Sequence, residues 1–346
     1  MIYGQTELHN VEQLVPVEGR PGALLQRVPE SVRSELVEHG ARAVRRAAAV
    51  EIRFAAPVGA QASVTLASYG GGSKVQIFYG EYWVEDRTVG EAPTVITVSE
   101  PEPGFQFLQP YKSHVPRTSF GPIWRIVIQG NEVHLLDIRG EGMRPPAADE
   151  KPAARYLAYG TSITFGASAA APELTYVGQT AWRLGMDAIN LGVPGAAFCE
   201  QAMADHIASR TDWDIATLCI SVNMLNQGVP TERFEERAEA MVRTMASAHP
   251  DKPIVCIGLF KGFPDLGWTW PGRVVHGDSA SYRDALRRIV ERCGSPNVHY
   301  ADGNELLDDW RGLSHDLLHP GNNGMIRNGE RLAERMRPLL PNRTTG

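Results

Sequence analysis

Cysteine is scarce in this sequence, and the cysteines that are present form no pattern. Four occur among 346 residues, far apart and without a CxxC pair. This spacing excludes a disulfide-rich scaffold, because such scaffolds need a dense set of paired cysteines. We therefore expect reduced, mostly buried thiols at Cys199, Cys219, Cys256 and Cys293.

Long hydrophobic runs and the features of a signal peptide are also missing. No stretch reaches the roughly 18 consecutive apolar residues of a membrane-spanning helix. The start of the chain, MIYGQTELHNVEQLVPVEG, lacks both the basic region and the apolar region of a secretory signal. The sequence thus predicts a cytoplasmic protein.

Positive charge does not dominate the chain. There are 34 Lys and Arg residues against 40 Asp and Glu residues, which gives a formal net charge of -6. Nucleic acids and anionic membranes attract basic patches, so we expect neither as a partner. A composition of 43% hydrophobic and 21% charged residues is typical of a globular chain with a large core. The length predicts two domains.

The first part of the chain has the pattern of an antiparallel sandwich. After a short predicted helix at 30–39, runs of alternating apolar and polar residues are bounded by Gly and Pro. Gly130 and Asn131 separate the last two runs, and a two-residue loop that starts with Gly predicts a type II′ hairpin. Many strands without intervening helices indicate a jelly-roll-type β-sandwich over residues 1–148. The predicted strands cover residues 50–54, 62–67, 74–79, 94–99, 124–129 and 132–138.

A stretch rich in proline and alanine, residues 141–154, precedes a different pattern and is typical of a connection between domains. From residue 155 onward, buried-strand patterns alternate with amphipathic helical patterns. We expect residues 149–346 to form an α/β domain with a doubly wound parallel sheet. Its predicted strands cover residues 155–158, 188–191, 215–220, 254–259 and 298–300, and its helices cover 231–248, 281–293 and a segment after Asn322.

Residues suited to acyl chemistry follow the strands of this predicted sheet. Ser162, Gly195 and Asn223 come after the first three strands, and the carboxyl ends of parallel strands meet at one edge. Near the C-terminus, Asp316 precedes His319 by three residues. Histidine can take the proton of a serine hydroxyl while aspartate holds its Nδ1–H. The backbone N–H groups of Ser162 and Gly195 and the amide of Asn223 would then stabilise an oxyanion.

Together these segments resemble the SGNH (GDSL-type) hydrolases. The matching blocks are YGTSITFG with Ser162, NLGVPG with Gly195, SVNM with Asn223, and DLLHPGNNG with Asp316 and His319. The resemblance covers about residues 155–340 and implies a flavodoxin-like sheet with a Ser-His-Asp triad. A β-sandwich before such a domain is similar to the subgroup of carbohydrate esterases and antibiotic-pathway acyltransferases.

The sequence departs from the family pattern at two blocks. Thr161 stands where the family has the aspartate of its Gly-Asp-Ser block, so the hydrogen bonds of that aspartate must be made in another way. The third block lacks the usual glycine and aspartate and has Ser221 and Met224 around Asn223. The amide donor is retained, while the shape of the site beside it differs.

Other interpretations of the same residues give different chemistry. An α/β-hydrolase would need a G-x-S-x-G elbow, and the sequence around Ser162 is GTSIT. Ser162 could merely cap a helix. His315, Asp316 and His319 could bind a metal from one helix face, but Pro320 directly follows and no HExxH motif is present. We expect neither a metal nor a cofactor.

The predicted function is a serine esterase that cleaves a small acyl ester through an acyl-Ser162 intermediate. The alternative is an acyltransferase that moves an acyl group from a thioester donor such as acyl-CoA to a hydroxyl of a glycosylated or polyketide-type small molecule. The partners are then a small-molecule ester or acyl donor and an alcohol acceptor. A remote alternative is an inactive carbohydrate-binding scaffold. The sequence makes no prediction of the oligomeric state.

Two groups of aromatic residues each allow a binding role or a packing role. Residues 260–278 form a long loop after the fourth strand, in which Trp268 and Trp270 either contact substrate or pack the loop against the domain. In the first domain, Tyr79, Tyr82 and Trp83 either stack on a sugar or lie in the core.

Overall fold

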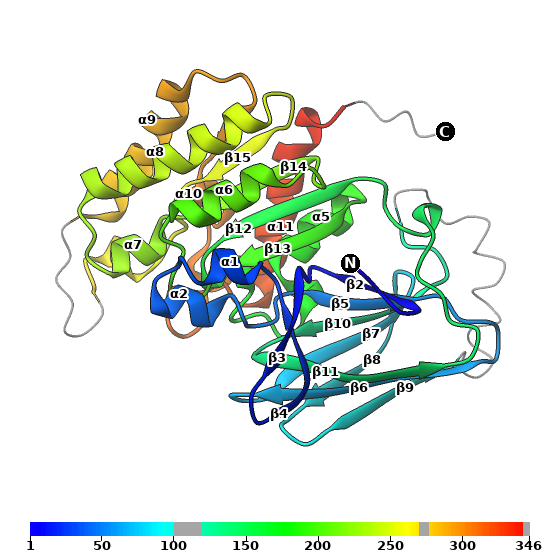
Figure 1. Cartoon of the computed structure of the whole chain (residues 1–346). Coiled ribbons are helices and arrows are strands. Elements are labelled where there is room, and N and C mark those ends of the chain that lie inside the picture. The colour runs from blue at the N-terminus through cyan, green and yellow to red at the C-terminus, as the bar shows by residue number, and fades with distance from the viewer. Residues whose placement is uncertain (100–118, 270–276, 342–346) are drawn as a thin grey trace. The chain divides into compact units, whose positions relative to one another are not determined.

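The computed structural model describes residues 1–99, 119–269 and 277–341, which divide into two compact units (Figure 1). Neither unit is continuous in sequence. A segment before residue 44 belongs to the second unit, and a segment after residue 184 belongs to the first. The first unit contains Met1–Glu30, Val44–Ala154 and Gly185–Ile189, and the second contains Ser31–Ala43, Arg155–Leu184 and Asn190–Gly346. None of the helices within the described ranges is long and apolar enough to cross a membrane.

The first unit is a β-sandwich of two antiparallel sheets, as the alternating sequence pattern predicts. One sheet has the strand order β1-β2-β5-β10-β7-β8, and the other has the order β3-β4-β11-β6-β9. In the first sheet the strands are β1 (Ile2–Tyr3), β2 (Thr6–His9), β5 (Val50–Phe54), β10 (Trp124–Gln129), β7 (Ser73–Tyr79) and β8 (Tyr82–Val89). In the second they are β3 (Gln13–Val17), β4 (Arg20–Gln26), β11 (Glu132–Gly140), β6 (Gln61–Tyr69) and β9 (Thr94–Ser99).

The apolar residues of both sheets meet in one core. Ile52, Ile77 and Ile126 lie on neighbouring strands of one sheet and are fully buried, as is Leu66 of the other sheet. This packing follows from the period of two in a strand, which sends every second side chain to the same face. Burial of such a side chain contributes roughly 1.5 to 3 kcal/mol.

The aromatic residues around the turn between β7 and β8 separate into two environments. Tyr79 is buried and packs edge-to-face on Trp124, with ring centroids 5.1 Å apart. Tyr82 and Trp83 are 43% and 55% exposed. The packing role therefore holds for Tyr79, whereas the other two rings stay accessible to solvent.

The predicted hairpin at Gly130 and Asn131 is wrong. β10 pairs with β5 and β7, whereas β11 pairs with β4 and β6 of the other sheet, so the chain crosses between sheets at this point. The turn is held by its surroundings, since the N–H of Gly130 donates to Ala47 and the N–H of Asn131 to the Ser73 hydroxyl. A glycine is needed there, because a Cβ on Gly130 would lie 2.7 Å from the Cα of Ser73.

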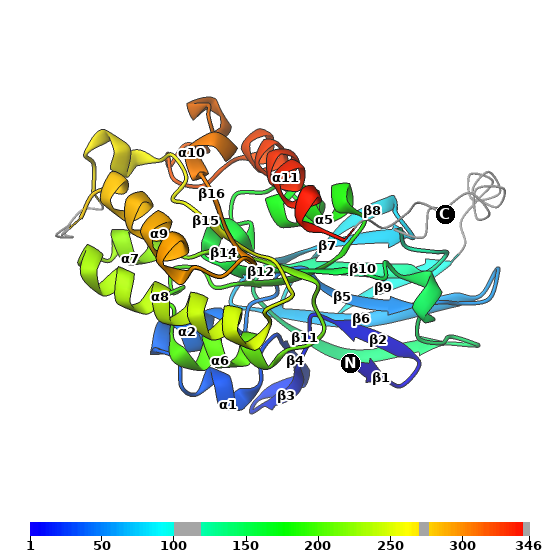
Figure 2. The same cartoon turned by 90° about the horizontal axis from the view of Figure 1, so that it is seen from above.

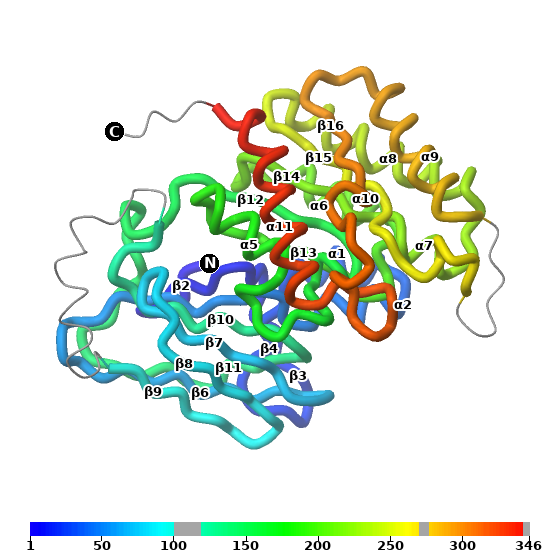
Figure 3. The backbone as a smooth tube through the Cα atoms, turned by 180° about the vertical axis from the view of Figure 1, so that it is seen from behind, coloured from blue at the N-terminus to red at the C-terminus, as the bar shows by residue number. Residues whose placement is uncertain are grey.

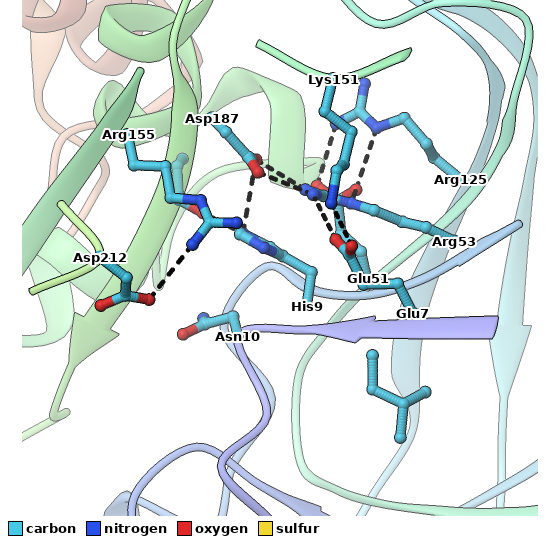
Figure 4. Close-up of polar contacts among 12 residues, drawn as sticks. Glu7, His9, Asn10, Glu51, Arg53, Arg125, Lys151, Arg155, Asp187 and Asp212 are labelled. Atoms are coloured by element: carbon cyan, nitrogen blue, oxygen red, sulfur yellow. Dashed lines mark hydrogen bonds and ion pairs between the residues drawn. The ribbon is translucent and has the colours of Figure 1, made fainter. Parts of the chain in front are cut away.

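A fully buried arginine lies at the centre of an ion cluster in the first unit (Figure 4). The guanidinium of Arg53 donates two hydrogen bonds of 2.7 Å to Asp187 and one of 2.7 Å to Glu51. It also contacts Glu7 at 3.3 Å, and Lys151 pairs with the same Glu7. Because a buried charge is tolerated only when partners satisfy it, the guanidinium and its carboxylates depend on one another.

The pKa values of the buried carboxylates reflect this dependence. Burial raises the pKa of Glu51, but the charges and hydrogen bonds of Arg125 and Arg53 outweigh burial and hold it well below its usual range. Burial also raises the pKa of Asp187, but the charge of Arg53 outweighs burial, and the net pKa is lowered. A folded-state pKa below the unfolded value of about 4 means that the cluster stabilises the fold fully above that value. The contribution is lost as the pH falls through the lowered values.

The second unit contains a five-stranded sheet flanked by helices, which confirms the predicted α/β fold. The strand order β13-β12-β14-β15-β16 is that of a flavodoxin-like doubly wound sheet. The strands are β12 (Arg155–Gly160), β13 (Asp187–Gly192), β14 (Ile215–Cys219), β15 (Ile254–Ile257) and β16 (Val298–Ala301). The pairs β12–β14, β14–β15 and β15–β16 are parallel.

Helices cover both faces of this sheet. Figure 2 shows α5 (Tyr176–Leu184) and α11 (Asn322–Met336) on one face, and α6 (Gln201–Ser209), α8 (Thr231–Ala248) and α9 (Ser279–Cys293) on the other. The packing of α11 against α5 is also visible from behind (Figure 3). Between α8 and α9, Phe234 stacks on Tyr282 with ring centroids 4.4 Å apart.

The helix ends follow local sequence signals. Asp278 caps α9, since its side chain accepts a 2.7 Å hydrogen bond from the N–H of Ser281, and this cap places the start of the helix two residues before the predicted one. Gly294 ends α9 in the left-handed conformation, with φ of 62°. The remaining helices include the short α4 (Ser162–Phe165), α7 (Val222–Asn226) and α10 (Gly303–Leu306).

The helix predicted at 30–39 is instead two short helices, α1 (Glu30–Arg33) and α2 (Glu38–Ala43). Between them the backbone N–H of Val37 donates a 2.7 Å hydrogen bond to the side chain of Glu200. That donor is thus unavailable for a continuous helix, which explains the break. Both residues belong to the second unit.

Removal of the Arg53 guanidinium from the ion cluster should strongly destabilise the fold. We expect Arg53→Met to lower the free energy of unfolding by about 3 to 5 kcal/mol at neutral pH, because three buried carboxylates lose their contacts with the guanidinium. The loss should shrink below about pH 4, where those carboxylates become protonated in the variant. Urea titrations at several pH values measure both effects.

Arg87→Met is the matched control for this substitution. Arg87 pairs with Glu85 at the surface of the same unit, and its side chain is 55% exposed. The control should change the stability by no more than about 1 kcal/mol. Equal effects of the two substitutions would contradict the dependence on burial.

Candidate active site

Ser162 lies just beyond the carboxyl end of β12, where the strand turns into α4. Gly160 packs so closely on β14 that a Cβ there would lie 2.6 Å from the carbonyl oxygen of Cys219. The N-cap of α4 is Thr161, whose hydroxyl accepts a hydrogen bond from the N–H of Ile163. Thr161 therefore supplies the cap, and the hydroxyl of Ser162 is left for another partner.

Buried polar groups hold the short helix behind Ser162. The amide of Asn190 donates a 2.8 Å hydrogen bond to the carbonyl of Thr164 and accepts one of 2.9 Å from the N–H of Gly192. Thr164 Oγ1 lies 2.8 Å from the hydroxyl of Tyr176. These contacts tie the serine turn to β13 and to α5. The block NLGVPG therefore contributes Asn190 as well as Gly195, a role that the sequence pattern does not predict.

His319 and Asp316 meet Ser162 in a continuous chain of contacts. The Nε2 atom of His319 lies 2.7 Å from Ser162 Oγ, and its Nδ1 atom lies 2.6 Å from Asp316 Oδ2. The side chains of His319 and Asp316 are 17% and 26% exposed. The structure thus brings together the three residues that the sequence predicts as nucleophile, base and orienting carboxylate.

The second oxygen of Asp316 organises the loop that carries the histidine. Oδ1 accepts hydrogen bonds from the backbone N–H groups of Leu318 and His319, each 2.9 Å long, and from the hydroxyl of Ser314 at 2.8 Å. Burial raises the pKa of Asp316, but the hydrogen bond from His319 and those of the loop hold it well below its usual range. The carboxylate is therefore ionised at neutral pH.

Backbone contacts complete this loop. Leu317 adopts a left-handed conformation with φ of 52°, which is uncommon for a bulky residue, and its carbonyl accepts a 2.7 Å hydrogen bond from the N–H of Phe263. The loop is not helical, so the helix-face metal site weighed for His315, Asp316 and His319 does not form. Across the described ranges, no group of three or more His, Cys, Asp or Glu residues could hold a metal ion.

Gly195 and Asn223 follow the two strands that flank β12. The carboxamide oxygen of Asn223 accepts a 3.1 Å hydrogen bond from the N–H of Ala197, which fixes the orientation of the amide and leaves its Nδ2 for other acceptors. Gly195 has a φ of 75°, which favours glycine. Among the described residues, none accepts from the Nδ2 of Asn223 or from the backbone N–H of Ser162 or Gly195.

The predicted substrate contacts of the loop after β15 stay predictions. Trp268 is 57% exposed and follows a short 3-10 helix, Phe263–Leu266. Arg283 anchors that helix through two hydrogen bonds to Asp265, 2.7 and 2.9 Å long. Trp270 lies outside the described residues.

Comparison with known proteins gives a family match for part of the chain. Residues 158–326 match the model of the GDSL-like lipase/acylhydrolase family. No curated protein matches the sequence.

Several solved structures share the fold over most of the chain, all at sequence identities too low to indicate more than fold. A salicylyl-acyltransferase, SsfX3, from a tetracycline biosynthetic pathway has a TM-score of 0.74 and 16% identity, with 98% of each chain covered. A family two carbohydrate esterase from Clostridium thermocellum, in complex with cellohexaose, has a TM-score of 0.59 and 15% identity, with 85% of this chain and 93% of the other covered. An acetyl xylan esterase from Butyrivibrio proteoclasticus has a TM-score of 0.58 and 11% identity, with 96% of this chain and 98% of the other covered.

The two oxygens of Asp316 allow its two contacts to be separated by mutation. Asp316→Asn keeps an oxygen for the loop but places an amide against His319 Nδ1. We expect the reaction of Ser162 with a fluorophosphonate to slow by several orders of magnitude, on the order of 10⁴ as in comparable triads, with the melting temperature nearly unchanged.

Asp316→Ala should slow labelling as much and also lower the melting temperature, because the hydrogen bonds of Oδ1 are lost too. Labelling kinetics and thermal melts of both variants measure the two effects. Identical melting temperatures for the two variants would show that Oδ1 does not organise the loop.

Proposed function

We propose that this protein is a serine esterase that cleaves a small acyl ester through an acyl-Ser162 intermediate, in keeping with the match of residues 158–326 to the GDSL-like lipase/acylhydrolase family. The observation that carries the proposal is the chain of contacts from Ser162 Oγ through the ring of His319 to Asp316, at 2.7 and 2.6 Å. A serine hydroxyl is a weak nucleophile unless an adjacent base removes its proton. Nε2 of His319 is at the distance that this transfer requires.

In the first step, Ser162 Oγ attacks the ester carbonyl while its proton passes to His319 Nε2. The carbonyl π bond opens to an oxyanion, and the ionised Asp316 stabilises the imidazolium through Nδ1–H. When the carbonyl re-forms, the bond to the alcohol breaks and His319 returns the proton to the leaving oxygen. Water then attacks the acyl-serine by the same route, which releases the acid and restores Ser162.

Three N–H groups that donate to no residue in the described part of the chain support the oxyanion step. They belong to Ser162, Gly195 and Asn223, which follow three adjacent strands of the sheet. Fixed donors stabilise a developing oxyanion without reorganisation, and one such donor contributes roughly 3 to 4 kcal/mol in comparable sites. The hydrogen bond from Ala197 to Asn223 Oδ1 supports the amide orientation that this role needs.

Acyl transfer is the second candidate function. Its support is the likeness in fold to a salicylyl-acyltransferase, which has a TM-score of 0.74, against 0.59 and 0.58 for the two esterases. The two reactions share the acyl-serine and differ in what attacks it. A bound alcohol wins over water when it is held close to the acyl carbon and water is excluded.

Substitution of the nucleophile tests the esterase proposal. Ser162→Ala should lower kcat by on the order of 10⁶ and abolish labelling by a fluorophosphonate, while the fold is retained. Ser168→Ala, a same-sized change six residues away, should leave both unchanged. Turnover of p-nitrophenyl esters and intact-mass spectra after labelling measure the effects. Near wild-type turnover by Ser162→Ala would remove Ser162 from the mechanism.

Product analysis separates the two candidate functions. Wild-type protein is incubated with an acyl-CoA donor and with glycosylated or polyketide-type alcohols, and the products are identified by mass spectrometry. Hydrolysis predicts free acid as the main product at every acceptor concentration. An acylated acceptor that forms faster than free acid, and that disappears in Ser162→Ala, would establish the transferase instead.

A further inference from the structure

A segment from the first 50 residues lies on the loop that carries Gly195. The segment Ser31–Ala43 belongs to the second unit, and the blue α2 lies near the green α6 in Figures 1 and 2. Glu200, the N-cap residue of α6, accepts a 2.7 Å hydrogen bond from the N–H of Val37. Leu36 beside it is buried, with 7% of its surface exposed. The segment is thus anchored to the chain that follows Gly195.

This anchoring brings an imidazole against Gly195. A Cβ placed on Gly195 would lie 2.6 Å from His39 Nε2, 3.3 Å from its Cδ2 and 3.6 Å from its Cε1. The nitrogen edge of the ring therefore approaches the glycine most closely. Gly195 accommodates the imidazole because it has no side chain.

The rest of the His39 ring is open to solvent. The residue is exposed, and its side chain has no hydrogen bond or ion pair with another residue in the described part of the chain. Among the described residues, an imidazole nitrogen beside a proposed oxyanion donor is thus left to solvent. A substrate that binds over Gly195 takes the place of solvent at that nitrogen.

We propose that His39 is a specificity-determining residue that binds a polar oxygen of the substrate close to the reacting carbonyl. This inference rests on the proposed function, since it takes the N–H of Gly195 to hold the oxyanion. The chemical reason is desolvation: an apolar substrate group over Nε2 leaves that nitrogen without a partner, whereas an ether or hydroxyl oxygen replaces the water. The oxygen can belong to the acyl group or to the alcohol.

Two pairs of isosteric esters test the proposal. In the acyl pair, p-nitrophenyl methoxyacetate is compared with p-nitrophenyl butyrate. In the alcohol pair, 2-methoxyethyl acetate is compared with butyl acetate. For at least one pair, His39→Ala should lower kcat/KM of the oxygen-containing ester by roughly 10-fold more than that of its isostere, the worth of one hydrogen bond. The affected pair shows which side of the substrate His39 binds.

Further variants separate binding from a structural role. His39→Gln retains a side-chain N–H and should recover much of the selectivity, whereas His39→Phe keeps the ring without nitrogen and should resemble His39→Ala. Glu38→Ala, on the same helix and at the surface, where Glu38 pairs with Arg42, should leave the ester ratios unchanged. The melting temperature and the labelling rate of Ser162 should stay at wild-type values in all four variants.

Equal losses for both members of each pair, or no loss in either, would overturn the proposal. A fall in melting temperature that accompanies equal losses would show that His39 only supports the fold. The ratios compare variants with wild type on the same ester, so the different reactivities of the esters cancel. Because failure of the esterase proposal appears as turnover that survives in Ser162→Ala, the two failures are distinguishable.

Discussion

The parallel register of β12 and β14 is the constraint on which the candidate site depends. Gly160 pairs with Cys219, so both strands end at the same level of the sheet. Ser162 follows one end by two residues, and Asn223 follows the other by four. On the opposite side of β12, the N–H of Val193 donates to the carbonyl of Gly160, which brings the Gly195 loop to the same edge. A slip in this register would separate the nucleophile from its proposed oxyanion donors.

Side-chain orientation at the site is fixed mainly by backbone N–H groups. Asp316 uses one oxygen for the backbone of its own loop and the other for His319. Asn223 uses its oxygen for the N–H of Ala197 and leaves its nitrogen available. In both cases a single polar side chain holds a loop and presents a group for chemistry. Such preorganised groups need little rearrangement as charge develops in the transition state.

Neither of the two compact units is continuous in sequence. The segment Ser31–Ala43 joins the second unit through contacts such as that of Val37 with Glu200, and Gly185–Ile189 belongs to the first unit, where Asp187 completes the Arg53 cluster. Asp187 is distant from Arg53 in sequence, but their pairing is favourable because an unpaired buried guanidinium strongly destabilises the fold. The domain boundary predicted at residue 148 rests on a change in the sequence pattern along the chain. The contacts of Val37 and Asp187 instead join segments that are distant in sequence.

Sequence patterns predict both fold types, most strands of the two units and the five residues proposed for catalysis, but not β1 to β4, β8 or the role of Asn190. Hydrophobic period predicts β5 and α8 to the residue, and strand ends followed by Ser162, Gly195 and Asn223 predict their common edge. Two features are seen only in the folded protein: Gly130 leads from one sheet to the other, and His39 lies against Gly195. Local patterns report which face of an element is buried, because that depends on neighbours in sequence. Which distant segment covers that face depends on packing between elements, and no short pattern records it.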